Sequence, residues 1–223
     1  MTGERLDEQT MALRVAKEFE DGMVVNLGVG IPTLCSNFVP PEKEIIFHSE
    51  NGIIGFGPIV TDPDDADENL INAGVQPVQP KPGMAIVDHA ESFAIIRGGY
   101  IDLAVLGALQ VSERGDLANY TLPGKEGGSF GGGQDLAFCA KKVVAVMTHT
   151  TREGKPKIVK ELTSPITAPA CVNLIITDIA AIEVTNQGLL LTEAVPGWTP
   201  EDIQAITEAQ LRVAPGLREM ELL

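Results

Sequence analysis

Hydrophobic residues along this chain gather in short aliphatic runs that end in glycine, proline or polar residues. Runs of this length, rich in Val, Ile and Leu, are typical of strands buried on both faces of a parallel sheet. The expected strands are residues 23–27, 45–47, 84–88, 103–106, 143–147 and 172–176, with a shorter one at 158–159. Two further runs, 182–185 and 189–191, flank Asn186-Gln187-Gly188 and predict a hairpin with glycine in its turn.

Segments of mixed apolar and polar residues lie between these runs and predict helices. They are residues 6–19, 33–38, 90–97 and 134–140, while residues 110–133 are expected to form a polar, glycine-dense loop. A last helix is expected from Pro200 to about Ala209, with Thr199 as N-cap, Asp202 at N3 and a tail after it. The alternation of strands and helices predicts an α/β fold, with one domain over residues 1–223. Its open, mostly parallel sheet is flanked by helices and followed by a C-terminal hairpin and helix.

Composition narrows the class of protein. Hydrophobic residues make up 44% of the chain but aromatic residues only 4%, so the core is expected to be large and aliphatic. The formal net charge of −15 argues against binding to nucleic acid or to an anionic membrane surface. The N-terminal residues lack the apolar segment of a secretory signal, and no run reaches the roughly 18 apolar residues of a membrane span. We therefore expect a cytoplasmic protein.

Residue types that commonly bind metals do not form a recognisable site in the sequence. Cys35, Cys139 and Cys171 are widely spaced and contain no C-x-x-C pair, so buried reduced thiols are expected. The three histidines are not at helical spacing either. The acidic run at residues 61–68 carries five carboxylates and no cation, which is compatible with a metal site but favours a solvated loop. We expect no metal and no permanently bound cofactor.

Residues 49–58 are the first candidate for a functional site. They begin with Ser49-Glu50-Asn51-Gly52, directly after a predicted strand. Open α/β sheets bind ligands outside the carboxyl ends of their strands. A glutamate at that position, followed by glycines that allow close approach of backbone to a ligand, is a candidate for catalysis. The alternative is that Glu50 only caps a turn. His48, two residues away, is either a group that tunes Glu50 or a structural histidine.

Two other glycine-rich segments offer backbone N–H groups to a ligand. Gly28-Val29-Gly30 follows the first predicted strand and opens a short helix, although it is not a dinucleotide fingerprint. Residues 127–133 are mostly glycine and precede another predicted helix. A carboxylate that acts as an acyl-accepting nucleophile requires such N–H groups for the developing oxyanion. From the residues alone, general base, metal ligand and nucleophile all remain open for Glu50.

Several motifs in order along nearly the whole chain resemble the B subunit of a family I CoA-transferase, of the acetoacetate/3-oxoacid and 3-oxoadipate group. The matching segments are residues 26–32, 49–52, 93–99, 106–112, 115–120, 123–125 and 171–173. The resemblance implies that Glu50 is the catalytic nucleophile. An acyl-CoA would acylate it to a mixed anhydride, the CoA thiolate would convert this to a glutamyl-CoA thioester, and a second acid would take the CoA in ping-pong fashion.

The same resemblance implies roles for further residues. Oxyanion N–H groups would come from Gly132 and Gly133, with Asn51 beside the nucleophile. The CoA arm and acyl group would be bound by the residues Asn26, Gly28, Val29, Gly30, Asn119, Lys125 and Gly131. The implied substrates are acyl-CoA and short carboxylic acids. The implied partner is the A subunit of the CoA-transferase, in a heterodimer or an α2β2 heterotetramer.

This sequence also departs from the family pattern. Phe130-Gly131-Gly132-Gly133-Gln134 stands where the family usually has Met-Gly-Gly-Ala-Met, and Val75 and Tyr120 also differ. The altered loop leaves the acid specificity open. Two other functions also stay open: hydrolysis or decarboxylation of an acyl-CoA on the same fold, and a non-catalytic subunit that binds CoA or a partner.

Overall fold

A ten-stranded mixed sheet forms the framework of the computed structural model, which describes residues 3–122, 124, 128 and 130–222. Its strand order is β13-β12-β11-β10-β8-β5-β1-β2-β3-β4. The five central strands are parallel: β10 (Leu174–Thr177), β8 (Lys142–Met147), β5 (Leu103–Gly107), β1 (Val24–Leu27) and β2 (Ile46–Ser49). These are the aliphatic runs that the sequence predicts as buried strands, and the expected open, mostly parallel sheet flanked by helices is confirmed.

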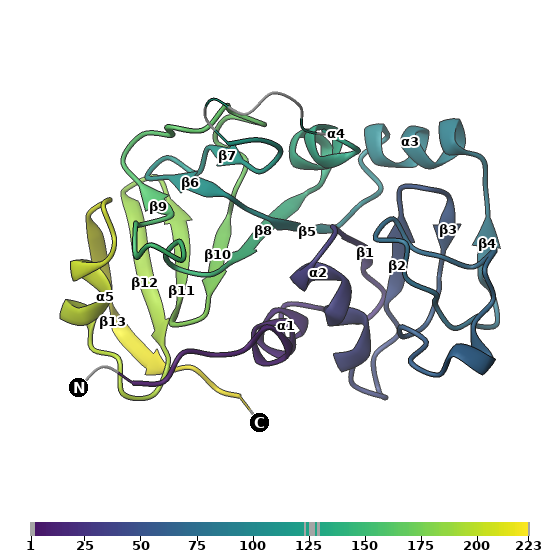
Figure 1. Cartoon of the computed structure of the whole chain (residues 1–223), viewed down its shortest axis with the longest axis horizontal. Helices are drawn as coiled ribbons and strands as arrows, with labels where there is room; N and C mark the ends of the chain where they lie inside the picture. The colour runs from purple at the N-terminus through teal and green to yellow at the C-terminus, as the bar shows by residue number, and fades with distance from the viewer. Residues whose placement is uncertain (1–2, 123, 125–127, 129, 223) are drawn as a thin grey trace.

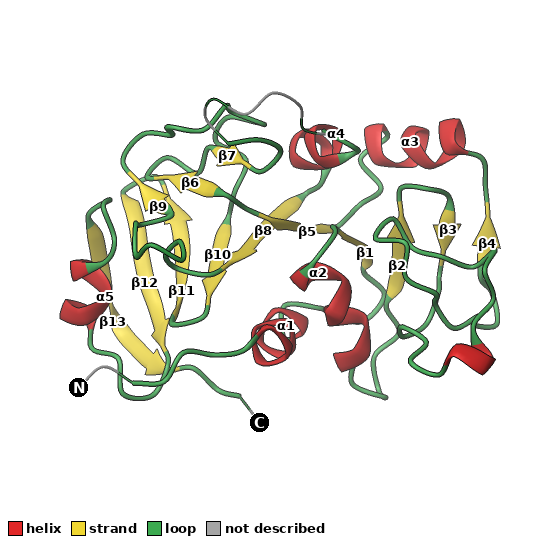
Figure 2. Ribbon diagram, viewed as in Figure 1, coloured by secondary structure: helices red, strands yellow, loops and turns green. Residues whose placement is uncertain are grey.

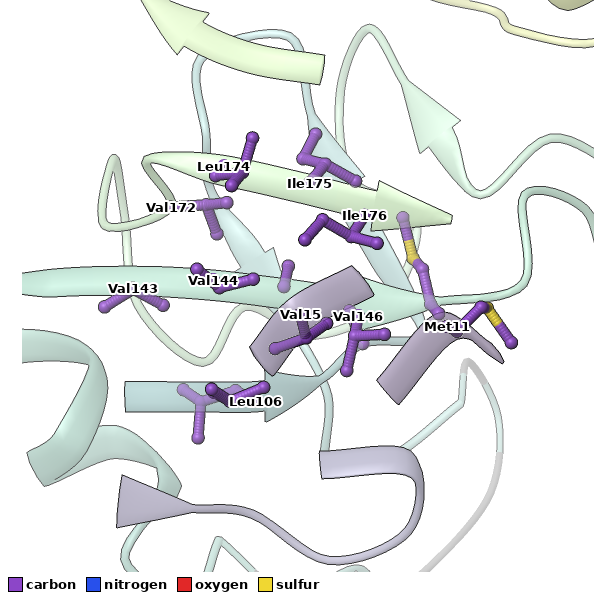
Figure 3. Packing of buried hydrophobic residues seen from close by; sticks show 14 of the residues in the cluster. Met11, Val15, Leu106, Val143, Val144, Val146, Val172, Leu174, Ile175 and Ile176 are labelled. Carbon is purple, nitrogen blue, oxygen red and sulfur yellow. The ribbon is translucent and has the colours of Figure 1, made fainter. Parts of the chain in front are cut away.

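Helices cover both faces of the central strands (Figures 1 and 2). One face carries α1 (Glu8–Ala16), α2 (Ile31–Leu34) and the 3-10 turn Cys35–Phe38. The other carries α3 (His89–Arg97) and α4 (Gly133–Cys139), which pack against each other. Figure 3 shows Met11 and Val15 of α1 packed on strand residues such as Val146 and Ile176, all of them almost fully buried. The core is aliphatic, as the composition predicts.

Antiparallel strands extend the sheet on both sides of its parallel centre. At one end, β3 (Ile53–Ile54) and β4 (Ala85–Ile86) pair antiparallel beside β2. At the other, β11 (Ala180–Thr185) and β12 (Gly188–Ala194) form the predicted hairpin beside β10. The strand expected at residues 84–88 is therefore only two residues long, and both of its side chains are exposed.

The chain ends in a strand, which corrects the expectation of a terminal helix and tail. Helix α5 (Pro200–Ala205) begins with the predicted Thr199–Asp202 capping box but ends before Ala209. The chain then forms β13 (Leu211–Glu219), which pairs parallel with β12. This strand is mostly exposed and contains Pro215 and Gly216, which are tolerated at a sheet edge but hide the strand pattern in the sequence.

A small second sheet combines two strands from the segment expected to be loop with the short strand expected at residues 158–159. It has the order β7-β6-β9, from Leu117–Ala118, Gln110–Ser112 and Ile158–Val159. The strands β6 and β7 are two or three residues long, too short to produce a periodic pattern. The acidic segment contains the 3-10 turn Pro63–Asp65, with its residues exposed, as expected for a solvated loop.

Candidate active site

A cavity of about 480 Å³ opens at the carboxyl ends of β1 and β5. From β1 the chain continues to β2 on one side and later returns to β5 on the other. Such a reversal of strand order leaves a crevice where α/β sheets bind ligands. The lining residues are Leu27, Gly28, Val29, Glu50, Ala73, Leu106, Gly107, Ala108, Leu109, Asn119, Phe130, Gly131, Gly132, Gly133 and Leu136.

Glu50 projects into this cavity from a tight turn at the end of β2. The N–H of Gly52 donates to the Ser49 carbonyl oxygen at 2.9 Å, so Glu50 and Asn51 form the middle of the turn. Gly52 has φ of +112°, and a side chain there would collide with the carbonyl oxygen of Val87. The glycine after the glutamate is thus required by the backbone, and the turn holds Glu50 in one place.

The second glycine-rich loop reaches Glu50 from the start of α4. The backbone N–H of Gly132 donates to Oε2 of Glu50 at 2.9 Å. A Cβ atom at Gly132 would overlap with the same carboxylate, so only glycine allows this approach. The loop is fixed by the bond from the Gly133 N–H to the Phe130 carbonyl oxygen at 2.9 Å.

Helix α4 is itself anchored, which fixes the position of the Gly132 N–H. Asp135 in its first turn forms an ion pair with Arg97 at the end of α3, with Nε and Oδ1 2.7 Å apart. The two helices pack together on the same face of the sheet. The N–H of Leu136 donates to the Gly132 carbonyl oxygen, so the glycine is the first acceptor of the helix.

Asn119 forms another wall of the cavity. Its Oδ1 accepts a bond from the hydroxyl of Thr167 at 2.8 Å, and its N–H donates to the same hydroxyl oxygen at 3.1 Å. The amide nitrogen of Asn119 lies on the side of Gly133. Thr167 therefore fixes the orientation of the Asn119 side chain at the cavity wall.

Glu50 alone is charged among the described residues that line the cavity. The other walls are aliphatic side chains, glycine backbone, the Asn119 amide and Phe130, whose ring stacks on Tyr120 with 3.9 Å between centroids. No group of three or more His, Cys, Asp or Glu side chains within the described ranges is arranged to bind a metal. A carboxylate in apolar surroundings with a backbone N–H at its oxygen suits nucleophilic acyl chemistry better than metal binding.

Of the residues proposed from the sequence, the structure brings Glu50, Gly28, Val29, Asn119 and residues 131–133 together. Three others lie elsewhere. Asn26 is 1% exposed beneath the site, and Gly30 begins α2 outside the cavity lining. The side chain of Asn51 donates to the Ile71 carbonyl oxygen at 2.7 Å instead of facing the cavity. Lys125 lies outside the described residues.

His48 has a structural environment. It is fully buried, and its ring nitrogens contact Asn26 and Ser92. Burial lowers the pKa of His48, so the ring is neutral at physiological pH. Ala73 lies at the cavity wall and Thr167 and Ser92 lie behind it, and none of the three is predicted from the sequence. They are small residues on separate segments, and no local pattern marks them.

The cysteines are free thiols, as expected from their spacing, but only Cys35 is fully buried, whereas Cys139 and Cys171 are partly exposed. Burial raises the pKa of the Cys35 thiol, and also that of Cys171 to about 11. None of the three lines the cavity. In the part of the chain that is described, every helix is too short or too polar to cross a membrane.

Comparison with known proteins agrees with this geometry. Residues 8–205 match the family model described as Coenzyme A transferase. The probable coenzyme A transferase subunit beta of Bacillus subtilis is 44% identical over 207 residues, which are 93% of this chain and 95% of that protein. The mitochondrial succinyl-CoA:3-ketoacid coenzyme A transferase 2 of Homo sapiens is 46% identical over 98% of this chain, which spans only 43% of that protein.

Solved structures support the fold. A crystal structure of an acyl-CoA transferase from Escherichia coli superposes with a TM-score of 0.77 and 23% identity, covering 99% of this chain and 44% of that one. The match of the family model over most of the chain is decisive, together with the near full-length bacterial relative. This chain, with Glu50 at the strand end where its glycine-rich loops meet, belongs to the coenzyme A transferase family.

Proposed function

We propose that this chain is the B subunit of a CoA-transferase that moves CoA between an acyl-CoA and a free carboxylic acid of the 3-oxoacid type. The observation that carries the proposal is the Glu50 carboxylate in the cavity, 2.9 Å from the Gly132 N–H. The 3-oxoacid class follows the name of the human relative. Residues 1–223 would act as one domain, with CoA thioester as substrate and no resident cofactor.

The proposed reaction has two matching halves. The Glu50 carboxylate attacks the thioester carbonyl, forming a mixed anhydride and releasing CoA thiolate. The thiolate attacks the Glu50 carbonyl, which gives a glutamyl-CoA thioester and frees the first acid. A second carboxylate then attacks that thioester, and the released thiolate takes the new acyl group, so that Glu50 is regenerated. Each attack places negative charge on an oxygen, which a backbone N–H stabilises.

Gly132 is the residue best placed to supply that N–H. Its donor already points at the Glu50 carboxylate, where the oxyanion of a Glu50 adduct would form. The N–H of Gly133 is donated to Phe130, and the Asn51 amide to Ile71, so an oxyanion role for either requires a rearrangement. Asn119, Gly28 and Val29 would contact the acyl group or the CoA arm from the cavity wall.

The proposed partner is the A subunit of the CoA-transferase, in a heterodimer or an α2β2 heterotetramer. The bacterial relative is named as a beta subunit, and the human relative is more than twice as long as the region that it shares with this chain. The partner would supply the second half of the site. The isolated chain is therefore expected to be inactive.

Mass spectrometry tests the proposal directly. The chain is co-purified with the A subunit and incubated with acetoacetyl-CoA or succinyl-CoA, and the masses of the chain and of its peptides are then measured. The wild type is expected to gain the mass of CoA less one water on a peptide that contains Glu50, and Glu50→Gln is expected to gain nothing. Glu153→Gln is the matched control, since Glu153 lies on an exposed turn outside the cavity.

The other outcomes separate the alternatives. Release of free CoA without an acceptor acid would indicate hydrolysis, and loss of carbon dioxide from the acyl group would indicate decarboxylation. Tight CoA binding without adduct or turnover would leave only a binding role for the chain. Testing the wild-type complex with a panel of acceptor acids then identifies the acids that are exchanged.

A further inference from the structure

A row of buried polar residues lies directly beneath the turn that carries Glu50. Asn26 on β1, His48 and Ser49 on β2, and Ser92 on α3 are each exposed by 2% or less. None of them lines the cavity. Burying a polar group destabilises the fold unless the group is hydrogen-bonded. Four connected buried polar residues beside the proposed nucleophile therefore suggest a function for them.

The hydrogen bonds in this row run in one direction. The Asn26 amide nitrogen lies 2.9 Å from Nδ1 of His48, and an amide NH₂ can only donate. Nδ1 of His48 is therefore the acceptor, and the proton of the neutral ring is on Nε2. That proton is donated to the Ser92 hydroxyl oxygen at 3.1 Å. The hydroxyl hydrogen of Ser92 is left to point at the Ser49 carbonyl oxygen, 3.5 Å away.

The row ends on the backbone group that defines the Glu50 turn. The Ser49 carbonyl oxygen also accepts the Gly52 N–H at 2.9 Å, the bond that closes the turn. The hydroxyl of Ser49 accepts the N–H of Ala73, a cavity residue, at 2.8 Å. The same short segment is thus held from below by α3 and from the side by the loop at Ala73.

We infer that His48 is a positioning residue for Glu50, which fixes the Ser49–Gly52 turn through Ser92. The inference rests on the proposed function of Glu50 and goes beyond it. His48 does not touch the substrate; it orients the Ser92 hydroxyl, and the hydroxyl steadies the carbonyl that precedes the nucleophile. Asn26 sets the tautomer of His48, which explains why that asparagine lies under the site instead of in it.

Two substitutions of His48 separate positioning from simple packing. In His48→Gln the side-chain amide nitrogen reaches the place of Nε2 and can still donate to Ser92. In His48→Asn the shorter amide reaches only the place of Nδ1, and the donor to Ser92 is lost. Ser92→Ala removes the hydroxyl while leaving the histidine. His149→Asn is the matched control, because His149 is equally buried but bonded to Thr177 and Thr207, away from the cavity lining.

The variants are compared in complex with the A subunit. For His48→Asn and Ser92→Ala, we expect the rate of Glu50–CoA thioester formation to fall about tenfold or more, within the roughly 100-fold that a 1 Å misplacement can cost. Acyl-CoA affinity should stay within about threefold. We expect His48→Gln to react within about threefold of the wild type, and His149→Asn to lose stability but keep its rate.

Hydrogen exchange at the Gly52 amide gives a readout that does not depend on catalysis. Faster exchange in His48→Asn and Ser92→Ala, but not in His48→Gln or His149→Asn, is the expected result. Unchanged rates and unchanged Gly52 exchange in His48→Asn and Ser92→Ala would overturn the inference and leave a purely structural histidine. If the wild type forms no thioester, the proposed function fails, and Gly52 exchange still decides whether His48 holds the turn.

Discussion

Replacing Gly132 by alanine is expected to separate the proposed nucleophile, Glu50, from its proposed oxyanion donor while preserving the fold. The backbone of Gly132 has φ of −83° and ψ of 0°, a conformation that alanine also adopts. Its new methyl group would overlap with the Glu50 carboxylate, and Phe93 leaves little room beside it. Because the carboxylate is the movable end of a side chain, it must turn away from the Gly132 N–H.

The size of the effect follows from the bond that is lost. Loss of one oxyanion donor typically lowers kcat by about 10²–10³, or about 2.7–4 kcal/mol of transition-state stabilisation. Gly132 provides the one N–H that donates to Glu50 among the described residues. We therefore expect thioester formation to slow by at least about 100-fold in Gly132→Ala. The free energy of unfolding should change by only about 1.5–3 kcal/mol, the net value of one hydrogen bond to a charged group.

The assay is single-turnover formation of the Glu50–CoA thioester, followed by mass spectrometry of the complex with the A subunit. Gly216→Ala is the matched control, because a Cβ there would meet nothing within 4 Å and the residue lies on β13, outside the cavity lining. We expect its rate within about threefold of the wild type. A Gly132→Ala rate equally close to the wild type would refute the role given to the Gly132 N–H.

Three further predictions concern stability and can be measured by urea unfolding of the chain. Arg14→Met removes the buried one of the two arginine partners of Glu193, 2.6 Å away, and is expected to cost about 3 kcal/mol at pH 7, at the low end for a buried pair because Arg218 still bonds Glu193. Burial alone would raise the pKa of Glu193, but its bonds to Arg14 and Arg218 outweigh burial and hold the pKa below its usual value. The stabilisation by the ionised Glu193 is thus fully present above a pH of about 4.5 and is lost as the pH falls through the lower folded-state pKa. Glu193→Gln should therefore weaken the dependence of the unfolding free energy on acid pH. An unchanged dependence in this variant would contradict the role given to Glu193. Val75 has φ of +60° with an exposed side chain, so Val75→Asn should raise stability by about 0.5–1 kcal/mol, whereas a loss would show that the valine is not strained. Thr199→Ala should lose about 1 kcal/mol with the capping box of α5, and no change would mean that the cap is dispensable.

The sequence predicts those parts of the fold that burial controls. The central strands are buried on both faces by helices, so they must be continuous aliphatic runs such as Val143–Met147, and such runs can be recognised in the sequence. Strands at the sheet edge and in loops need no such run. The strand β13 alternates poorly and contains Pro215, because one of its edges is unpaired. The position of β13 beside β12 depends on tertiary pairing, which a short segment of sequence does not reveal.

In the candidate site, too, features with a local sequence signal are predicted and those that depend on the fold are not. Glu50 is marked by its position after a buried strand, and Gly132 by the density of glycines around it. Both signals are local. The contact between them joins segments 82 residues apart and depends on how α4 packs against α3. The cavity residue Ala73 and the supporting Thr167 are likewise brought in by the fold, so residue type alone does not identify them.

Asn26 shows what a family resemblance cannot supply without the fold. The resemblance implies that Asn26, just before the Gly28 turn, binds the CoA arm or the acyl group. In the sheet, however, Asn26 is the register partner of His48 on β2, and the two side chains meet inside the protein. Register between parallel strands is set by the crossover and by the core, so it cannot be deduced from either strand alone. Once the register is known, an asparagine opposite a histidine beneath the Glu50 turn is better understood as support for that turn than as a contact for the proposed substrate.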